Sequence, residues 1–525
     1  MSINGQPNVA ELDTFLPQDG SKQDGQYGKY KVSVSPTKKL DADAEALQDG
    51  KSYFDPFKGR QNLPNSTTDC DTLTHLLKAS LGSGILAMPI AFRDCGIVAG
   101  IFATILVSLV CTHCAYILVK CAHELYYKTR VTSMSFADVG EIAFANGPPW
   151  ARRFSGLARV SIIGGLFAAY FGTCSVYTVI IATNFQQVIE FYTGDDEATS
   201  GDRIRLYIAA LMIPLVLISW VPNLKKLAPI SMVANAFMGV GLLITFYYLS
   251  IDLPSVAERA YVAPFEVMPQ FFSITIFAME AIGVVMPLEN AMKTPQHFIG
   301  ICGVLNQGMG GVTMIYIFLG FLGYLKYGAD TKGSITLNLP TEDYAAQAVK
   351  ILVGLAVFCT YGLQYFVCLE IVWNSVKDRF QKNSALAEYV VRTILTVAAV
   401  ILAVAVPTIG PFLGLIGALC FSLLGLIIPV FIEFVTFWDK GFGPCNWIVW
   451  KNILVLICGF LALVFGSYTS FLEIINVKDP LPPLETFRNE SSLLGNETMA
   501  NLNATLQQIG DDLLNSTIEA MNKFT

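Results

Sequence analysis

Three ionisable side chains lie inside long apolar stretches, where a charge is costly. Glu280 follows the apolar run Phe277–Met279, and His75 and Lys78 lie three residues apart on one helical face. A charge at mid-bilayer costs about 2.5–3.5 kcal/mol, so such residues usually face a cavity and have a function. Glu280 could take up a proton, accept an ammonium group or cap a backbone N–H, and the sequence leaves these roles open. His75 suits proton coupling because its unperturbed pKa is about 6.5; a neutral structural histidine is the alternative.

The backbone near these side chains offers a second kind of chemistry, the recognition of a zwitterion. Gly82, Ser83 and Gly84 leave the chain bare at mid-span, and a helix that starts there exposes N–H groups with partial positive charge. Such an end binds a carboxylate without an arginine. Carbonyls released at Phe277–Met279 could accept an ammonium group. The candidate substrate-binding residues are Gly82, Ser83, Gly84, Ile85, Phe277, Ala278, Glu280 and Thr360.

Metal and cofactor chemistry are not indicated by the sequence. Most of the twelve cysteines fall in apolar runs, where they are typical of small buried hydrophobes. Cys111 and Cys114 form a C-x-x-C inside an apolar helix with no second pair, and no Cys/His spacing indicates zinc. An enzyme would need a nucleophile or metal cluster near His75, and the sequence offers none. We therefore expect no cofactor, no metal and no enzymatic activity.

These residues must be positioned by helices that cross a membrane. Only 14% of the 525 residues are charged, against about 25% in soluble chains, and the net charge of −7 disfavours a nucleic-acid partner. A crossing needs about 20 mostly apolar residues. The sequence therefore predicts an all-α polytopic protein embedded in the lipid bilayer. Eleven spans are expected, at about 72–92, 96–120, 159–189, 205–221, 227–250, 268–290, 299–326, 347–374, 387–406, 410–436 and 447–472.

The first and sixth of these spans contain residues that weaken a helix at mid-depth. Gly82 and Gly84 flank Ser83 in the first span, and Glu280 precedes Gly283 in the sixth. Irregular backbone persists inside a membrane only where it lines a protein cavity. The two spans run in opposite directions and lie five apart, which predicts a 5+5 inverted repeat plus an eleventh helix. Broken helices in corresponding positions are typical of a transporter's midplane site, and ordinary helix packing is the alternative.

Lysines and arginines predict the orientation of the chain. With a cytoplasmic N-terminus, the inner loops hold eleven of them and the outer loops six, as the positive-inside rule requires. Eleven spans then place the C-terminal tail in the extracellular space or a lumen. Glycosylation acceptors must lie on that side. The tail carries four Asn-x-Ser/Thr sequons, at Asn489, Asn496, Asn503 and Asn515.

The chain divides into two polar tails and one apolar region. The N-terminal tail has no apolar signal-peptide core, and its composition is typical of a disordered segment. We predict a disordered cytoplasmic tail, a helical domain of two repeats with an extra helix, and a glycosylated outer tail. The corresponding residues are 1–71, 72–472 (repeats at about 72–250 and 268–436, last helix at about 447–472) and 473–525.

Two sequence phrases resemble those of the proton-coupled amino acid transporters, solute carrier family 36 of the amino acid/auxin permease group in the APC superfamily. They are HLLKASLGSGILAMPIAF, from His75, and FAMEAIGVVMPLENAMKTPQHF, from Phe277. The resemblance continues in TYGLQYFVCLEI, from Thr360, and spans most of the helical region. It implies a LeuT-like core, uptake of small neutral amino acids, and a proton-coupling role for His75. It also implies substrate contacts at Ser83, Gly84, Phe277 and Glu280.

The resemblance implies a secondary active transporter that works by alternating access, with proton symport toward the cytosol. Ser83 and Ala79 stand where relatives often have Thr and Gly or Asn, which leaves the preferred amino acid open. Two alternatives remain: a nutrient sensor that binds amino acids and signals to partners through its N-terminal tail, and an uncoupled facilitative transporter. Plasma membrane and lysosomal or endosomal membranes suit the chain equally.

Overall fold

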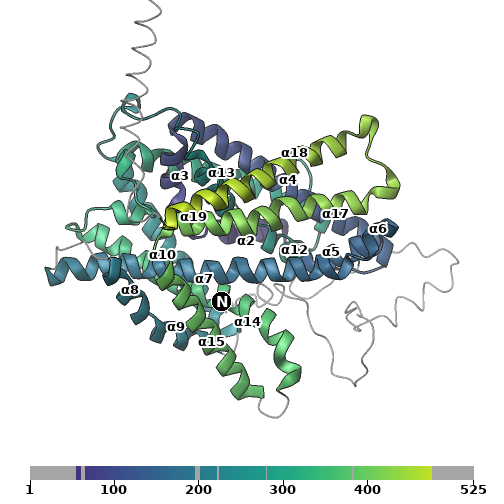
Figure 1. Cartoon of the computed structure of the whole chain (residues 1–525), viewed down its shortest axis with the longest axis horizontal. Coiled ribbons are helices and arrows are strands. Elements are labelled where there is room, and N and C mark those ends of the chain that lie inside the picture. Colours follow the sequence, from purple (N-terminus) through teal and green to yellow (C-terminus); the bar gives the residue numbers. More distant parts are fainter. Residues whose placement is uncertain are drawn as a thin grey trace, which may run out of the picture.

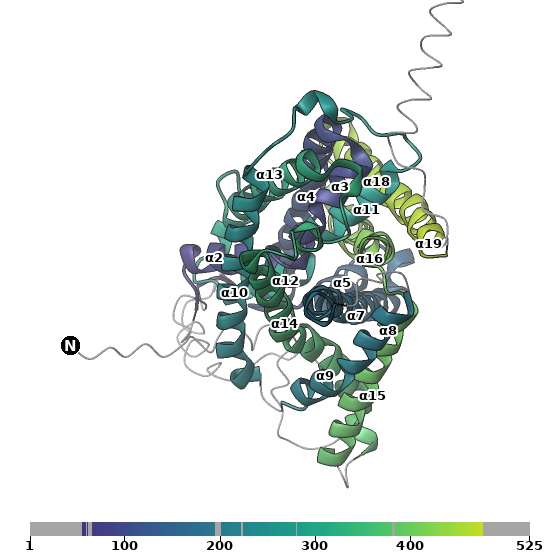
Figure 2. The ribbon, with the colours of Figure 1, turned by 90° about the vertical axis from the view of Figure 1, so that its left-hand side faces the viewer.

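The computed structural model describes residues 55–58, 60, 66–194, 201–221, 224–279, 281–380 and 384–475. This part of the chain is helical, and extended segments pair in it only at an isolated bridge between Thr67 and Met292. The main helices, shown in Figures 1 and 2, are α2 (Asp69–Ser80), α3 (Met88–Cys95), α4 (Ile97–Thr129), α5 (Phe136–Ala145), α7 (Ser155–Thr193), α8 (Gly201–Ala210), α9 (Met212–Ser219), α10 (Leu224–Ser250), α11 (Met268–Met279), α12 (Ile282–Ala291), α13 (Val304–Tyr327), α14 (Tyr344–Val376), α15 (Ser384–Ala405), α16 (Ile409–Ile416), α17 (Ile428–Thr436), α18 (Trp447–Leu461) and α19 (Ser467–Ile475).

The helices are long and apolar enough for a polytopic membrane protein, as predicted. Among the described residues nine helices could cross a membrane, or ten if the bent pair α2–α3 counts as one span. The predicted fourth span consists of two shorter helices, α8 and α9, which meet at Leu211. Pro214 explains the interruption, because it has no N–H for the carbonyl of Ala210 and its ring crowds that carbonyl. The total of eleven spans therefore stays a prediction.

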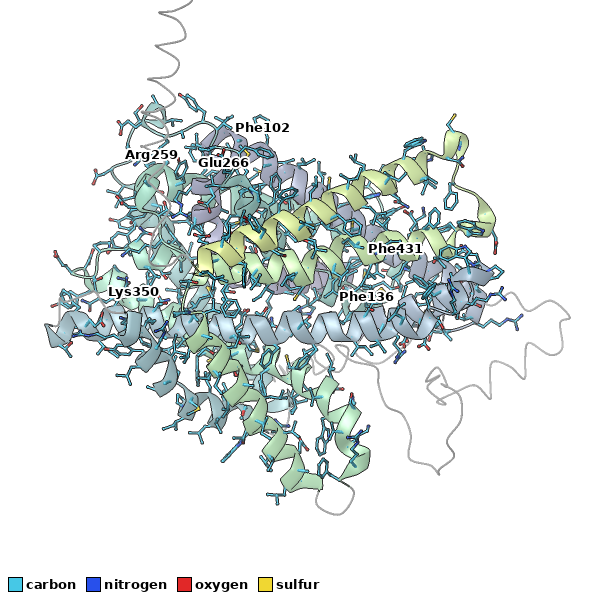
Figure 3. The ribbon with its side chains drawn as sticks, in the orientation of Figure 1. Phe102, Phe136, Arg259, Glu266, Lys350 and Phe431 are labelled. Carbon is cyan, nitrogen blue, oxygen red and sulfur yellow. The ribbon has the colours of Figure 1, made fainter. Side chains whose placement is uncertain are left out.

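Apolar side chains cover the outside of the bundle. Phe102 of α4 is 69% exposed and Phe431 of α17 is 41% exposed (Figure 3). Large exposed apolar surfaces mark sites that contact a membrane or a partner. Together with the long apolar helices, these side chains identify the surface as one that faces lipid.

Helix α7 occupies the middle of the molecule and is seen end-on in Figure 2. It packs against α5, α14 and α15, while α10 packs along the other side of α14. Helix α13 packs against α2, α3 and α4. The last helices, α18 and α19, lie on the outside of the bundle beside α16 and α17 (Figure 1).

The first and sixth spans are interrupted, and they run antiparallel to each other. The first divides into α2 and α3, bent by 46°, with the short helix η2 (Ser83–Ala87) between them. The sixth divides into α11 and α12. Helix α3 packs against α11 and α2 against α12, so the second half of one span lies beside the first half of the other. This antiparallel pairing is the arrangement that an inverted repeat predicts.

The helical region begins slightly earlier than the predicted boundary at residue 72. Helix α2 starts at Asp69 because Thr68 and Asp71 form a reciprocal capping box: the Thr68 hydroxyl accepts from the Asp71 N–H, and the Asp71 carboxylate accepts from the Thr68 N–H. At the other boundaries α10 ends at Ser250, α17 ends at Thr436 and α18 begins at Trp447. The four C-terminal sequons lie outside the described residues.

Candidate functional site

The interruption of the first span leaves backbone groups free at the end of α2. Helix α2 ends at Ser80, and η2 begins at Ser83 after Gly82, which offers no side-chain cap. Ser83, Gly84 and Ile85 are buried. The carbonyl of Ser80 accepts a hydrogen bond from the Tyr316 hydroxyl of α13 at 2.6 Å. A side chain from a third helix therefore supplies the hydrogen-bond donor that the broken helix no longer provides to this carbonyl.

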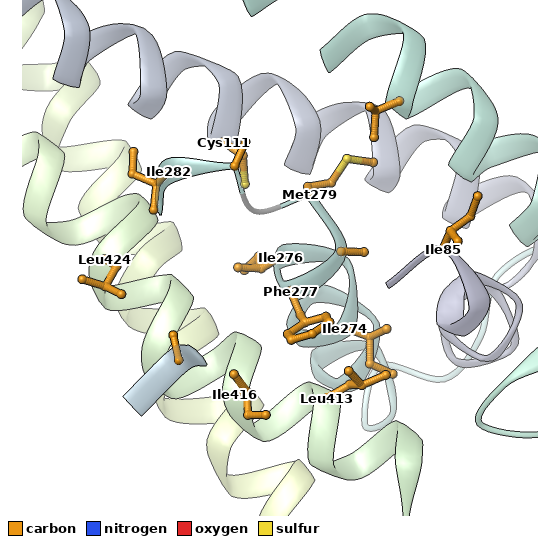
Figure 4. Close-up of a cluster of buried hydrophobic side chains, with 14 of the residues drawn as sticks. Ile85, Cys111, Ile274, Ile276, Phe277, Met279, Ile282, Leu413, Ile416 and Leu424 are labelled. Carbon is orange, nitrogen blue, oxygen red and sulfur yellow. The ribbon is translucent and has the colours of Figure 1, made fainter. Parts of the chain in front are cut away.

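The same hydroxyl reaches the interruption of the sixth span. Helix α11 ends at Met279 and α12 begins at Ile282 (Figure 4). The Tyr316 hydroxyl lies 3.1 Å from the carbonyl of Ala278, within the last turn of α11. Tyr316 is completely buried. One tyrosine thus joins the two breaks to each other.

The two interrupted spans also touch directly, at Gly84 and Ala278. A Cβ atom added to Gly84 would lie 2.8 Å from the Cα of Ala278 and 3.0 Å from its Cβ. Ordinary contacts of this kind begin at 3.4 Å, so a residue with a side chain does not fit here without displacing α11. The residues that the sequence singled out in separate spans, 82–85 and 277–279, therefore meet at one place.

Apolar side chains surround this meeting point. Phe277 is buried and packs edge-on against Phe421, with ring centroids 5.7 Å apart. Ile85 and Met279 are completely buried beside the breaks (Figure 4). Among the described residues, the hydroxyls of Ser80 and Thr275 are buried and have no hydrogen-bond partner. The surroundings thus combine an apolar wall with polar groups that still have hydrogen-bonding capacity.

The remaining residues that the sequence singled out belong to α2 and α14 or lie outside the described residues. Glu280 lies outside the described residues. His75 and Lys78 are half-buried on α2. The Thr360 hydroxyl donates to the carbonyl of Ala356 at 2.8 Å, so it is committed to its own helix. In the described part of the chain no group of three His, Cys, Asp or Glu side chains could hold a metal ion.

Sequence reasoning missed three polar residues at the breaks, Tyr316, Tyr177 and Gln364. The Tyr177 hydroxyl, on α7, interacts with the side chains of Ser83 and Gln364, and so links η2 to α7 and α14. A buried tyrosine must find a partner for its hydroxyl, so tyrosines inside apolar runs were an available signal. Many tyrosines share that signal, however, and only the fold selects these two.

Comparison with known proteins decides the family. The model of the family described as transmembrane amino acid transporter protein matches residues 65–472. The chain belongs to this family. It is therefore a multi-pass membrane transporter of amino acids and not an enzyme, and the resemblance seen in the sequence is confirmed.

Two curated relatives differ widely in their sequence identity to this amino acid transporter. The proton-coupled amino acid transporter-like protein pathetic of Drosophila melanogaster is 58% identical over 465 residues, which cover 89% of this chain and 95% of that protein. The amino acid transporter ANT1 of Arabidopsis thaliana is 25% identical over 442 residues, which cover 78% of this chain and 95% of that protein. The similarity to the first includes nearly the whole helical region.

Solved structures resemble this transporter more weakly. MhsT in complex with L-phenylalanine aligns with a TM-score of 0.42 at 14% identity, over 77% of this chain and all of that chain. Inward-facing Mhp1 aligns with a TM-score of 0.43 at 11% identity, over 83% of this chain and 96% of that chain. Scores of this size do not establish a shared fold. The LeuT-like arrangement rests instead on the two antiparallel interrupted spans.

Proposed function

We propose that this transporter moves small neutral amino acids toward the cytosol by alternating access, and that the substrate binds where α2–α3 and α11–α12 are interrupted. One observation carries the proposal: the Tyr316 hydroxyl bonds at 2.6 Å to the Ser80 carbonyl and lies 3.1 Å from the Ala278 carbonyl. Backbone freed from helical bonding is concentrated at this one place. Such backbone is tolerated at membrane depth where it lines a functional cavity.

The two breaks suit the two charged ends of an amino acid. The start of η2, at Ser83 and Gly84, would present N–H groups to the α-carboxylate. Carbonyls near the end of α11, at Phe277–Met279, would accept from the α-ammonium group. The buried side chains of Ile85 and Phe277 favour an apolar substrate side chain of modest size. This combination supports a neutral amino acid as the substrate.

Proton coupling is the driving force that we propose. The relative that is 58% identical is named as proton-coupled transporter-like. His75 and Glu280 are the residues that we propose to bind the coupled proton, with Glu280 also a candidate for contact with the substrate. A histidine titrates in the range where a proton gradient across a cell membrane operates.

Uptake into cells or proteoliposomes tests both parts of the proposal. Of a radiolabelled panel of proline, alanine, glycine and tryptophan, the small members should enter, and more quickly at an outside pH of about 5.5 than at about 7.5. Equal uptake at both values would favour the uncoupled facilitative alternative. Neither uptake nor exchange of any neutral amino acid would reject the proposed function.

We further propose a cytoplasmic N-terminus and an outer, glycosylated C-terminal tail. The greater number of Lys and Arg residues in the predicted inner loops supports this orientation. Treatment of the detergent-solubilised protein with a glycosidase tests it, because only a tail on the extracellular or lumenal side acquires N-glycans. Loss of mass should occur in the wild type and not after Asn→Gln substitution at all four sites, Asn489, Asn496, Asn503 and Asn515. A tail that a protease reaches only from the cytosol would contradict the orientation.

A further inference from the structure

A second buried polar cluster lies where the chain enters the bundle, and its centre is Glu289 of α12. The Glu289 side chain is completely buried. Its Oε1 lies 2.9 Å from Arg60 Nη1 and 2.9 Å from His123 Nε2, and its Oε2 accepts from the Tyr126 hydroxyl at 2.9 Å. His123 and Tyr126 belong to α4. Arg60, by contrast, comes from the segment that precedes the first span.

The Arg60 guanidinium occupies a site with an acceptor for each of its nitrogen atoms. Its Nε donates to the Thr132 carbonyl at 2.6 Å, and its Nη2 donates to the same carbonyl. Its Nη1 also donates to the Glu289 carbonyl at 3.2 Å, and the group lies 5.0 Å from the Tyr126 ring centroid. The side chain is 1% exposed. Acceptors arranged around a planar fork recognise arginine better than lysine.

The charge of Arg60 is retained in this buried position. Burial lowers the pKa of the Arg60 guanidinium, but the Glu289 carboxylate and Tyr126 outweigh that effect and raise the pKa above its usual value. An ion pair of this kind resists the removal of either partner, because the remaining charge would be buried without compensation.

Phe57 anchors the same segment a few residues earlier. It is buried, and its ring packs edge-on against His123 at 5.0 Å and Tyr127 at 5.8 Å between centroids. We call residues 55–58 and 60 the N-terminal strap. The strap lies against α4 through Phe57 and against α12 through Arg60.

The strap adds a further link between α12 and the α4–α5 region, which are also bonded directly, since Asn290 Nδ2 donates to the Met134 carbonyl at 2.8 Å. Helix α12 is tied to the start of α2, because Thr67 N–H donates to the Ala291 carbonyl at 2.8 Å and Lys293 N–H donates to the Thr67 carbonyl at 3.0 Å. Thr132 belongs to the connection between α4 and α5, and α5 packs against α7. Arg60 therefore joins the α2–α12 unit to the α4–α5 connection. The two cannot separate while its bonds to both persist.

We propose that the acceptors around Arg60 form a guanidinium-binding site whose ligand is the chain's own Arg60, and that its occupation locks this end of the transporter closed. The ligand class is an arginine on an extended segment. The inference rests on the proposed function in one respect, since alternating access requires this end of the protein to open in one of its states. Occupation of the site can nevertheless be measured without any amino acid substrate.

Native cysteines report whether this end is open. Cys111 of α4 is buried beside the link between α11 and α12 (Figure 4). Cys70 and Cys302 are exposed and should react in every variant, whereas Cys174, buried on α7, should react only on unfolding. Purified protein in nanodiscs is pulsed with N-ethylmaleimide, and labelling of each cysteine is followed by peptide mass spectrometry.

Arg60→Ala should raise the labelling rate of Cys111 about fivefold or more, while Cys174 stays unlabelled. Lys58→Ala is the matched control, because Lys58 carries the same charge in the same strap but is exposed. Arg60→Lys should give an intermediate rate, since an ammonium group cannot engage Thr132 and Glu289 together in the fork geometry. A wild-type rate in Arg60→Ala, or joint labelling of Cys111 and Cys174, would overturn the proposal.

A cross-link provides a second route that leaves Arg60 and Glu289 in place. Phe57→Cys with Tyr127→Cys, joined by a short bifunctional thiol reagent, should fasten the strap and slow Cys111 labelling below the wild-type rate. Dithiothreitol should restore that rate when the cross-linker is disulfide-bonded. A cross-linked protein that labels Cys111 at the wild-type rate would also overturn the proposal. An absence of uptake in the wild type would count against the proposed function and leave both labelling results unaffected.

Discussion

Replacement of Gly84 by alanine tests whether the two helix breaks must touch. The new Cβ would lie 2.8 Å from Ala278 Cα, where ordinary contacts begin at 3.4 Å, so α11 and η2 would have to move apart by at least 0.6 Å (3.4 minus 2.8). Overpacking of this kind costs about 1–3 kcal/mol. If the cost applies only to the state in which the breaks are closed on the substrate, it lowers that state's population by about 5- to 140-fold. We expect uptake to fall by a similar factor.

Gly310 of α13 provides a matched control away from the candidate binding residues. A Cβ at Gly310 would meet nothing within 4 Å, and alanine favours a helix more than glycine does. Initial rates of radiolabelled proline or alanine uptake, normalised to surface-expressed protein, are compared for Gly84→Ala, Gly310→Ala and wild type. Gly310→Ala should retain most of the wild-type rate. The reasoning is refuted if Gly84→Ala transports normally, or if both variants lose activity equally.

Three further substitutions address the same site. Tyr316→Phe removes the hydroxyl that bonds to Ser80 and Ala278. A buried carbonyl left without a donor costs about 1–3 kcal/mol, so both the thermal unfolding temperature and the apparent substrate affinity should fall, while Tyr327→Phe at the end of the same helix should change neither. His75→Ala should abolish the increase in uptake between an outside pH of about 7.5 and about 5.5; an unchanged increase would count against its proton role. Glu280→Gln should impair transport whether Glu280 binds a proton, an ammonium group or the backbone, and wild-type turnover would exclude it from the site.

The positions of the helix breaks were predictable because the sequence carries local signals for them. Gly82 and Gly84 weaken a helix through their backbone freedom, and the first span does break between Ser80 and Ser83. In the sixth span the break precedes Gly283, which lies inside α12. A Cβ at Gly283 would lie 2.4 Å from the Tyr170 hydroxyl, so this glycine makes room for a neighbouring side chain. The glycine pattern thus predicted where the two helices break, but Gly283 makes room for Tyr170 and does not itself break the helix.

The contacts that join distant segments were not predictable from the sequence. Tyr316 lies in an apolar run that looks like any other span, and its role depends on where α13 packs. Arg60 lies in a stretch whose polar composition is typical of disorder, yet it is buried against Glu289 at a separation of 229 residues. Glu289 lies at the end of the predicted sixth span, where the sequence alone gives no sign that its side chain is buried. Only the folded chain brings these acceptors to one guanidinium.

The central claim is that one amino acid is held between the two helix breaks, and a structure with bound substrate tests it most directly. A cryo-EM map of the full chain in nanodiscs with a saturating amino acid that it transports should show the carboxylate at the N–H groups of residues 83–85. The ammonium group should lie within hydrogen-bonding distance of the carbonyls of residues 277–279, close to Tyr316. Substrate density elsewhere in the bundle, away from the N–H groups of residues 83–85 and the carbonyls of residues 277–279, would contradict the account.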